Sequence, residues 1–145
     1  MTALAAELMV TFEKWTRHQL PLSAAKKAYK GGLAMGRPST ASVVPATTGA
    51  GAAGANDIVL GIFAETIDNT ANTATTALVN VDFLNERTIL WRANDGSITS
   101  ANLFSKCYAV DDQTVSATST NRAEAGTILA VDTILGVGFA TIGLP

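Results

Sequence analysis

At 145 residues, of which 48% are hydrophobic, 6% aromatic and 15% charged, the chain has the length of one ordinary domain but is poor in large side chains and in charges. We therefore expect a thin core and an apolar surface that other subunits cover in part. The single cysteine excludes a disulfide framework and an all-cysteine zinc site. No run approaches the roughly 20 apolar residues of a membrane-spanning helix, so we expect no membrane partner.

The net charge of −2 is divided unevenly along the chain. Residues 1–37 carry six basic and two acidic side chains, a net of +4, whereas residues 38–145 carry four basic and ten acidic ones, a net of −6. Opposite charges of this kind suit a contact in which the N-terminal region of one subunit meets the body of another. Nucleic acid is the alternative partner of a basic region. Because the basic residues are spaced out rather than clustered, we expect no nucleic-acid partner.

Residues 1–21 are expected to form an N-terminal arm, followed by a β body over residues 22–145. Apolar residues at positions 4, 8, 12 and 15 recur at helical spacing, while residues 10–14 also fit an alternating strand, so a short helix and an extended arm both stay open. Pro21 ends any helix before about Gln19. The start lacks the basic and long apolar regions of a secretion signal, and we expect synthesis in a reducing cytosol.

The body is expected to be all-β. Short apolar runs, several of them alternating with period 2, are separated by turn signals about every 8–12 residues, and no β–α alternation or internal repeat is found. The strongest turn signal is Asn-Asp-Gly at residues 94–96. We predict a small β-barrel or β-sandwich of about eight short antiparallel strands. They fall within residues 26–36, 41–46, 57–66, 77–84, 88–92, 106–110, 113–117, 126–132 and 135–142.

The ionisable and nucleophilic side chains form no catalytic pattern. His18, the only histidine, lies in the arm, which is the wrong setting for a residue that must be held rigidly. Cys107 is expected to be a quiet packed thiol, although Lys106 beside it could lower its pKa. Asp111 and Asp112 are expected to form a hairpin turn, because adjacent strand residues point to opposite faces and would not share a proton. We expect no enzyme.

Neither a metal nor a cofactor is expected. Asp68, Asn69, Asn72 and Thr73 could supply some oxygen ligands to calcium, but the EF-hand spacing is absent. The glycine-rich segment 47–56 is followed by neither the P-loop pattern nor a dinucleotide-binding fingerprint.

The arm and the start of the body carry residue types that dominate protein interfaces. One hypothesis is that these side chains insert into a neighbour, and the other is that Trp15 folds back onto its own body. Phe63, Phe83, Trp91 and Phe139 are expected in the core. Under the first hypothesis the contact residues are Phe12, Trp15, Arg17, Leu20, Leu22 and Tyr29.

Four stretches, taken together and in this order, resemble a family of small head decoration (capsid cement) proteins of tailed bacteriophages. The run CYAVDDQTV within the third stretch is the most specific, and the resemblance covers about residues 20–142, leaving the arm unmatched. The stretches are residues 26–35 (KKAYKGGLAM), 60–69 (LGIFAETIDN), 106–118 (KCYAVDDQTVSAT) and 125–132 (AGTILAVD), the last followed by the Gly-Val-Gly of residues 136–138.

The resemblance implies a small β-barrel or β-tulip-like body on the exterior of a virion capsid, made in the bacterial host cytoplasm. It further implies a homotrimer whose arm contacts the major capsid protein, and a structural role in bridging major capsid protein subunits. Two alternatives stay open. Another virion structural subunit, such as a tail-tube or fibre component, would form rings or fibres by itself, and a glycan- or peptide-binding β module would be a monomer with an exposed aromatic platform.

Overall fold

The computed structural model describes residues 17–47, 57–83 and 89–141, and confirms an all-β fold. No helix in this described part has the length and hydropathy needed to cross a membrane. One 3₁₀ turn, η1 (Ser100–Asn102), accompanies the strands. The strands are β1 (Arg17–Leu22), β2 (Lys27–Ala28), β3 (Leu33–Arg37), β4 (Ser42–Pro45), β5 (Ile58–Phe63), β6 (Ile67–Asp68), β7 (Ala77–Phe83), β8 (Ile89–Asn94), β9 (Lys106–Ala109), β10 (Thr114–Ser116), β11 (Glu124–Asp132) and β12 (Gly136–Thr141).

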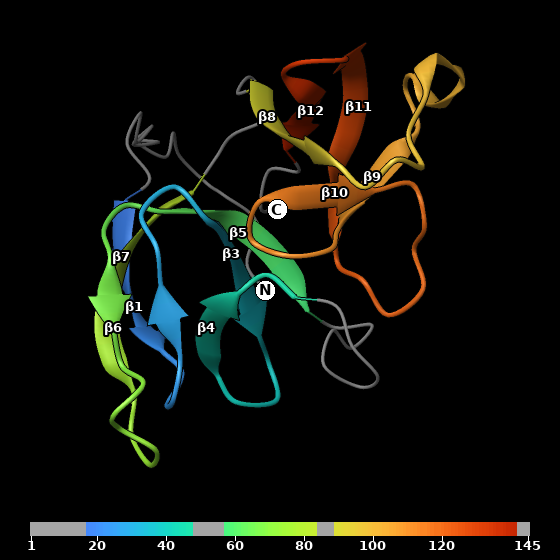
Figure 1. The fold of residues 1–145 in the computed structure, drawn as a ribbon. Helices are drawn as coiled ribbons and strands as arrows, with labels where there is room; N and C mark the ends of the chain where they lie inside the picture. Colours follow the sequence, from blue (N-terminus) through green and yellow to red (C-terminus); the bar gives the residue numbers. More distant parts are fainter. Residues whose placement is uncertain (1–16, 48–56, 84–88, 142–145) are drawn as a thin grey trace, which may run out of the picture.

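The strands form two closed five-stranded barrels that lie side by side (Figure 1). Barrel 1 has the strand order β1-β4-β3-β5-β7, and barrel 2 has the order β10-β8-β12-β11-β9. The short strands β2 and β6 pair with each other outside the barrels. The described residues therefore hold more strands than the eight predicted, and two barrels in place of one.

The inner end of the predicted arm belongs to barrel 1. Residues 17–22 form β1, which pairs antiparallel with β7 along its whole length and parallel with β4 at Leu22. The expected boundary between residues 21 and 22 therefore falls inside a strand, because residues 17–21 pair with β7 just as Leu22 does. Residues 1–16 lie outside the described residues.

The two barrels repeat one topology. In chain order, β1, β3, β4, β5 and β7 correspond to β8, β9, β10, β11 and β12, and in each set the first strand pairs in parallel with the third and antiparallel with the fifth. The parallel pairs have matching registers, with Leu22 opposite Val43 in barrel 1 and Asn94 opposite Val115 in barrel 2. The structure thus holds a repeat of topology, although the sequence shows no internal repeat.

A bulge followed by glycine recurs at the same place in both barrels. Against the second strand of its barrel, β5 bulges at Leu60 before Gly61, and β11 bulges at Ala125 before Gly126. A Cβ on Gly61 would lie 2.0 Å from a backbone oxygen of β7, and one on Gly126 would lie 2.1 Å from a backbone oxygen of β12. Only glycine permits these close approaches, so the two glycines fix where each barrel closes.

Strands β3, β4 and β5 pack on both of their faces. Their inward side chains join the core of barrel 1, and their outward side chains join the core of barrel 2. The bulge at Leu60 shifts the alternation of β5, so that Leu60 and Phe63 face barrel 1 whereas Val59 and Ile62 face barrel 2. We call the outward set the covering face; it consists of Leu33, Met35, Val44, Val59 and Ile62.

Hydrogen bonds accompany this packing between the barrels. The amide of Leu33 donates to the carbonyl oxygen of Asp112 at 2.8 Å, and the guanidinium of Arg92 donates to the carbonyl oxygen of Gly31. The two barrels are therefore joined by a shared apolar core and by polar contacts at its edge.

Replacing Gly61 by alanine is expected to lower the free energy of unfolding by about 3 kcal/mol or more, because the new methyl group meets a backbone oxygen that cannot retreat without opening the barrel. Gly36→Ala is the matched control, since its methyl group meets only the Leu60 side chain, at 3.2 Å. Urea unfolding followed by circular dichroism measures both losses. Equal losses in the two variants would contradict the role given to Gly61.

Candidate functional site

The structure separates the predicted contact residues from one another. Phe12 and Trp15 lie outside the described residues. Leu22 is fully buried inside barrel 1, so its prediction as a contact residue is wrong, because its position in β1 points it into the core. Leu20 is partly buried against the same core, whereas Tyr29 is 53% exposed.

Arg17 keeps an internal partner. Its guanidinium donates to both carboxylate oxygens of Asp82 on β7, at 2.7 and 3.1 Å, across the β1–β7 pair. This hydrogen bonding raises the pKa of Arg17, with the negative charge of Asp82 adding to the effect. The contact is exposed, so it anchors β1 only weakly.

The two groups considered as nucleophile or base lie in different surroundings. Cys107 is buried, and desolvation raises the pKa of its thiol to about 12, as expected for a packed thiol. Lys106 does not activate it, because its ammonium group lies 3.1 Å from the carboxylate of Glu124. His18 is exposed, and its ring centroid lies 5.2 Å from that of Phe83.

The oxygen-bearing side chains considered for calcium are engaged in loop structure. Asp68 accepts from the amide and hydroxyl of Thr70, and Asn72 accepts from the amide of Thr75. Asn69 is buried, and its side-chain amide donates to backbone oxygens on both sides, including that of Ser23 at 3.1 Å. These contacts shape the segment between β6 and β7.

A groove of about 1060 Å³ lies between the barrels. The chain turns of both barrels meet here, and the turn between β11 and β12 brings Ile134 to the rim with 91% of its surface exposed. We call it the inter-barrel groove. Its lining includes Tyr29, Trp91, Arg92, Asp112, Ile134 and Leu135.

Trp91 and Arg92 were the residues that sequence reasoning missed. Trp91 was expected in the core, as Phe63 and Phe139 are, but it is only partly buried, and its indole ring lies against Gly138, where a side chain would clash with it. The absence of a side chain at Gly138, opposite Trp91, leaves room for the ring beside β12. An alternating strand that carries Trp and Arg on successive positions was the available signal, because one of the two must face outward.

Arg92 and Asp112 place opposite charges in the groove without forming an ion pair. Desolvation lowers the pKa of Arg92 and raises that of Asp112, and the nearby Asp111 raises the latter further. Within the described residues Arg92 donates only to backbone carbonyl oxygens, those of Trp91 and Gly31. Both charged groups are thus partly desolvated, and the backbone holds the guanidinium of Arg92 in place.

Asp111 takes the turn role predicted for it. Its carboxylate accepts from the amide of Gln113 at 2.9 Å, which closes the turn between β9 and β10. Asp112, by contrast, points its carboxylate toward Gly32 of barrel 1, where a Cβ would lie 3.1 Å from it.

A second, smaller hollow of about 260 Å³ opens at one end of barrel 1. We call it the mouth of barrel 1; its lining is apolar and includes Leu20, Gly36, Val43, Ile58 and Leu60.

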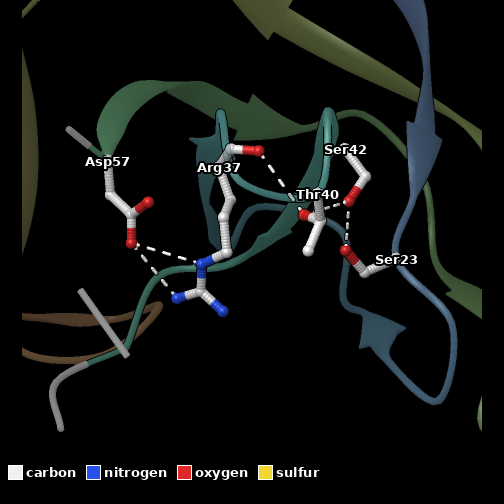
Figure 2. A network of polar contacts seen from close by, with 5 residues as sticks. All are labelled: Ser23, Arg37, Thr40, Ser42 and Asp57. Atoms are coloured by element: carbon white, nitrogen blue, oxygen red, sulfur yellow. Dashed lines mark hydrogen bonds and ion pairs between the residues drawn. The ribbon is translucent and has the colours of Figure 1, made fainter. Parts of the chain in front are cut away.

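At the rim of this mouth, the lining residues Arg37 and Ser42 belong to a network of polar contacts, which Figure 2 shows. Arg37 donates to the buried carboxylate of Asp57 at 3.2 and 3.3 Å. The hydroxyl of Ser42 contacts those of Ser23 and Thr40, the latter at 2.7 Å. The rim is therefore fixed by internal hydrogen bonds around an apolar centre.

Comparison with known proteins finds no matching family model, no matching curated protein and no matching solved structure.

Asp112→Asn is expected to raise the melting temperature at about pH 7 and to change it little at about pH 3. Burial raises the pKa of Asp112 in the folded state above the unfolded value of about 3.9, so the ionised carboxylate costs stability at high pH and this cost disappears as the group is protonated. Asp111→Asn, which keeps an oxygen for the amide of Gln113, is the matched control. A lower melting temperature for Asp112→Asn at pH 7, or an equal gain in the control, would contradict this account.

Proposed function

We propose that this protein is a structural virion protein that binds the outside of a phage capsid and stabilises it by bridging major capsid protein subunits. The observation that carries the proposal is the inter-barrel groove. It combines Trp91, Tyr29 and Arg92, the residue types that most often anchor protein interfaces, with exposed apolar side chains on its rim. The resemblance of residues 20–142 to capsid decoration proteins supports the identity of the partner.

The groove suits a partner protein better than a small reactant. It is open, and its charged lining residues are a lysine, an arginine held by a backbone carbonyl oxygen, and two aspartates. Ile134 exposes 91% and Leu135 58% of its surface, which water disfavours and a protein partner would cover. Many copies binding at once would make modest individual contacts effective on a capsid.

A feature of barrel 2 favours this role over a self-assembling tail or fibre subunit. The covering face of barrel 1 has a counterpart on barrel 2, which lies at the corresponding positions of the corresponding strands β9, β10 and β11. That counterpart carries Lys106, Tyr108 and Glu124 where the covering face has Leu33, Met35 and Val59. A further barrel stacking in the same way would have to desolvate the Lys106–Glu124 ion pair, which opposes open-ended stacking.

The alternative of a glycan- or peptide-binding module is favoured by one observation. Trp91 and Tyr29 lie in the same groove as the polar side chains of Asn94 and Gln113. Under this alternative the protein binds a free glycan or peptide and needs no capsid.

Binding to purified, expanded heads tests the proposal by cosedimentation. Wild-type protein is expected to bind and to raise the heat resistance of the heads. Ile134→Asp is expected to weaken binding about tenfold or more, because it places a charge at an apolar interface. Ile89→Asp, on a residue that is 54% exposed and lines neither hollow, is the matched control.

Deleting residues 1–16 tests the predicted arm, since it leaves β1 intact from Arg17. The account expects the truncated protein to stay folded and to lose binding to heads. Full binding without these residues would refute the arm's role. If the wild-type protein ignores heads and polymerises alone, or ignores heads and binds a glycan array, the corresponding alternative replaces the proposal.

A further inference from the structure

Because the two barrels share one topology, each end of barrel 1 can be matched, residue by residue, with an end of barrel 2. The end of barrel 2 that faces barrel 1 is formed by Arg92, Ala109, Ala123 and Ala125, together with the turn that holds Asp112. The covering face of barrel 1 packs over these residues and closes this end of barrel 2.

The registers identify the matching end of barrel 1. Leu22 of barrel 1 corresponds to Asn94 of barrel 2, because each is paired with its parallel partner strand at the same point. Leu20 and Arg92, each two residues earlier, therefore also correspond. Gly36 is opposite Val43, as Ala109 is opposite Val115.

The bulges extend the match to the fourth strands. Leu60 and Ala125 are the bulged residues of β5 and β11, so Ile58 and Ala123, two residues earlier in the chain, also correspond. Leu20, Gly36, Ile58 and Leu60 all line the mouth of barrel 1. The mouth of barrel 1 is therefore the counterpart of the covered end of barrel 2. Barrel 1 packs over that end of barrel 2, and in the part of the chain that the structure describes no barrel packs over the mouth.

The two ends differ in exposure within the described residues. Ala123 is 3% exposed beneath the covering face, whereas its counterpart Ile58 is 49% exposed. The lining of the mouth is almost wholly apolar, and its 260 Å³ suits one or two aliphatic side chains. An apolar hollow of this kind, with a rim fixed by the Arg37–Asp57 pair, is preformed for a ligand that fills it.

We propose that the mouth of barrel 1 is an interaction surface that receives an extended segment of the major capsid protein with aliphatic side chains on alternate residues. This identity of the partner rests on the proposed function. The kind of segment is taken from the molecule itself, because β3 presents Leu33 and Met35, two residues apart on one strand, to the corresponding end of barrel 2. Side chains at this spacing lie on the same face of a strand.

A second copy of this chain is the less suitable occupant. Stacking by the same relation would bring the counterpart of the covering face, with Lys106 and Glu124, onto the apolar mouth. The cost of burying that ion pair in an apolar hollow opposes such a dimer. A different polypeptide therefore suits the mouth better than a second copy does.

Cosedimentation with purified, expanded heads tests this inference with the full chain. Ile58→Lys places a charge in the mouth, and Pro38→Glu places one at its exposed rim. Each is expected to weaken head binding about tenfold or more, with an unchanged melting temperature. Ile89→Lys, on an isoleucine of matching exposure at 54%, is expected to bind like the wild type.

The outcomes separate this inference from the proposed function. If the wild-type protein binds heads and both mouth variants bind them as tightly as the wild type does, the inference is overturned and the proposed function stands. If Ile89→Lys weakens binding as much as Ile58→Lys, the effect is not specific to the mouth and the inference is also overturned. If the wild-type protein does not bind heads, the proposed function fails and the inference fails with it.

Discussion

The covering face of barrel 1 is the contact on which the rest of the structure depends. Strand β3 alternates so that Ala34 packs into barrel 1 while Leu33 and Met35 pack into barrel 2, and all three side chains are fully buried. At an order of 1.5–3 kcal/mol for each large buried side chain, this face supplies barrel 2 with a substantial part of its core. A chain with few large residues can therefore build two barrels only by sharing strands between two cores.

This sharing also creates the surfaces to which we assign function. Where barrel 1 packs over barrel 2, the turns of both barrels border the inter-barrel groove. In it, Arg92 donates to a carbonyl oxygen of barrel 1 and Asp112 lies close to Gly32. Where no barrel closes barrel 1, the apolar mouth stays accessible at Ile58. The polar counterpart of the covering face, with Lys106 and Glu124, opposes the stacking of a further barrel by the same relation.

Local pattern predicted the strands well because alternation and turn chemistry are local properties. The chain bends at the Asn-Asp-Gly segment, with the amide of Gly96 donating to the side-chain oxygen of Asn94 and Gly96 at φ +99°, but β8 pairs with β10 and β12 and forms no hairpin with the next strand, β9. The repeat cannot be seen in the sequence because corresponding positions carry unlike residues. Leu33 and Lys106 occupy corresponding positions, but Leu33 lies on a buried face and Lys106 on a face in contact with water. The local pattern does not show that Leu22 points into barrel 1, because the pairing of β1 with β4 and β7 joins residues far apart in the sequence. The groove likewise depends on how the two barrels pack against each other.

Differential scanning calorimetry tests most directly whether the two barrels depend on one shared core. The account predicts a single unfolding transition whose calorimetric and van't Hoff enthalpies agree, because barrel 2 cannot keep its core once the covering face is lost. Two separate transitions, or a calorimetric enthalpy well above the van't Hoff value, would show that the barrels unfold independently and would contradict the account.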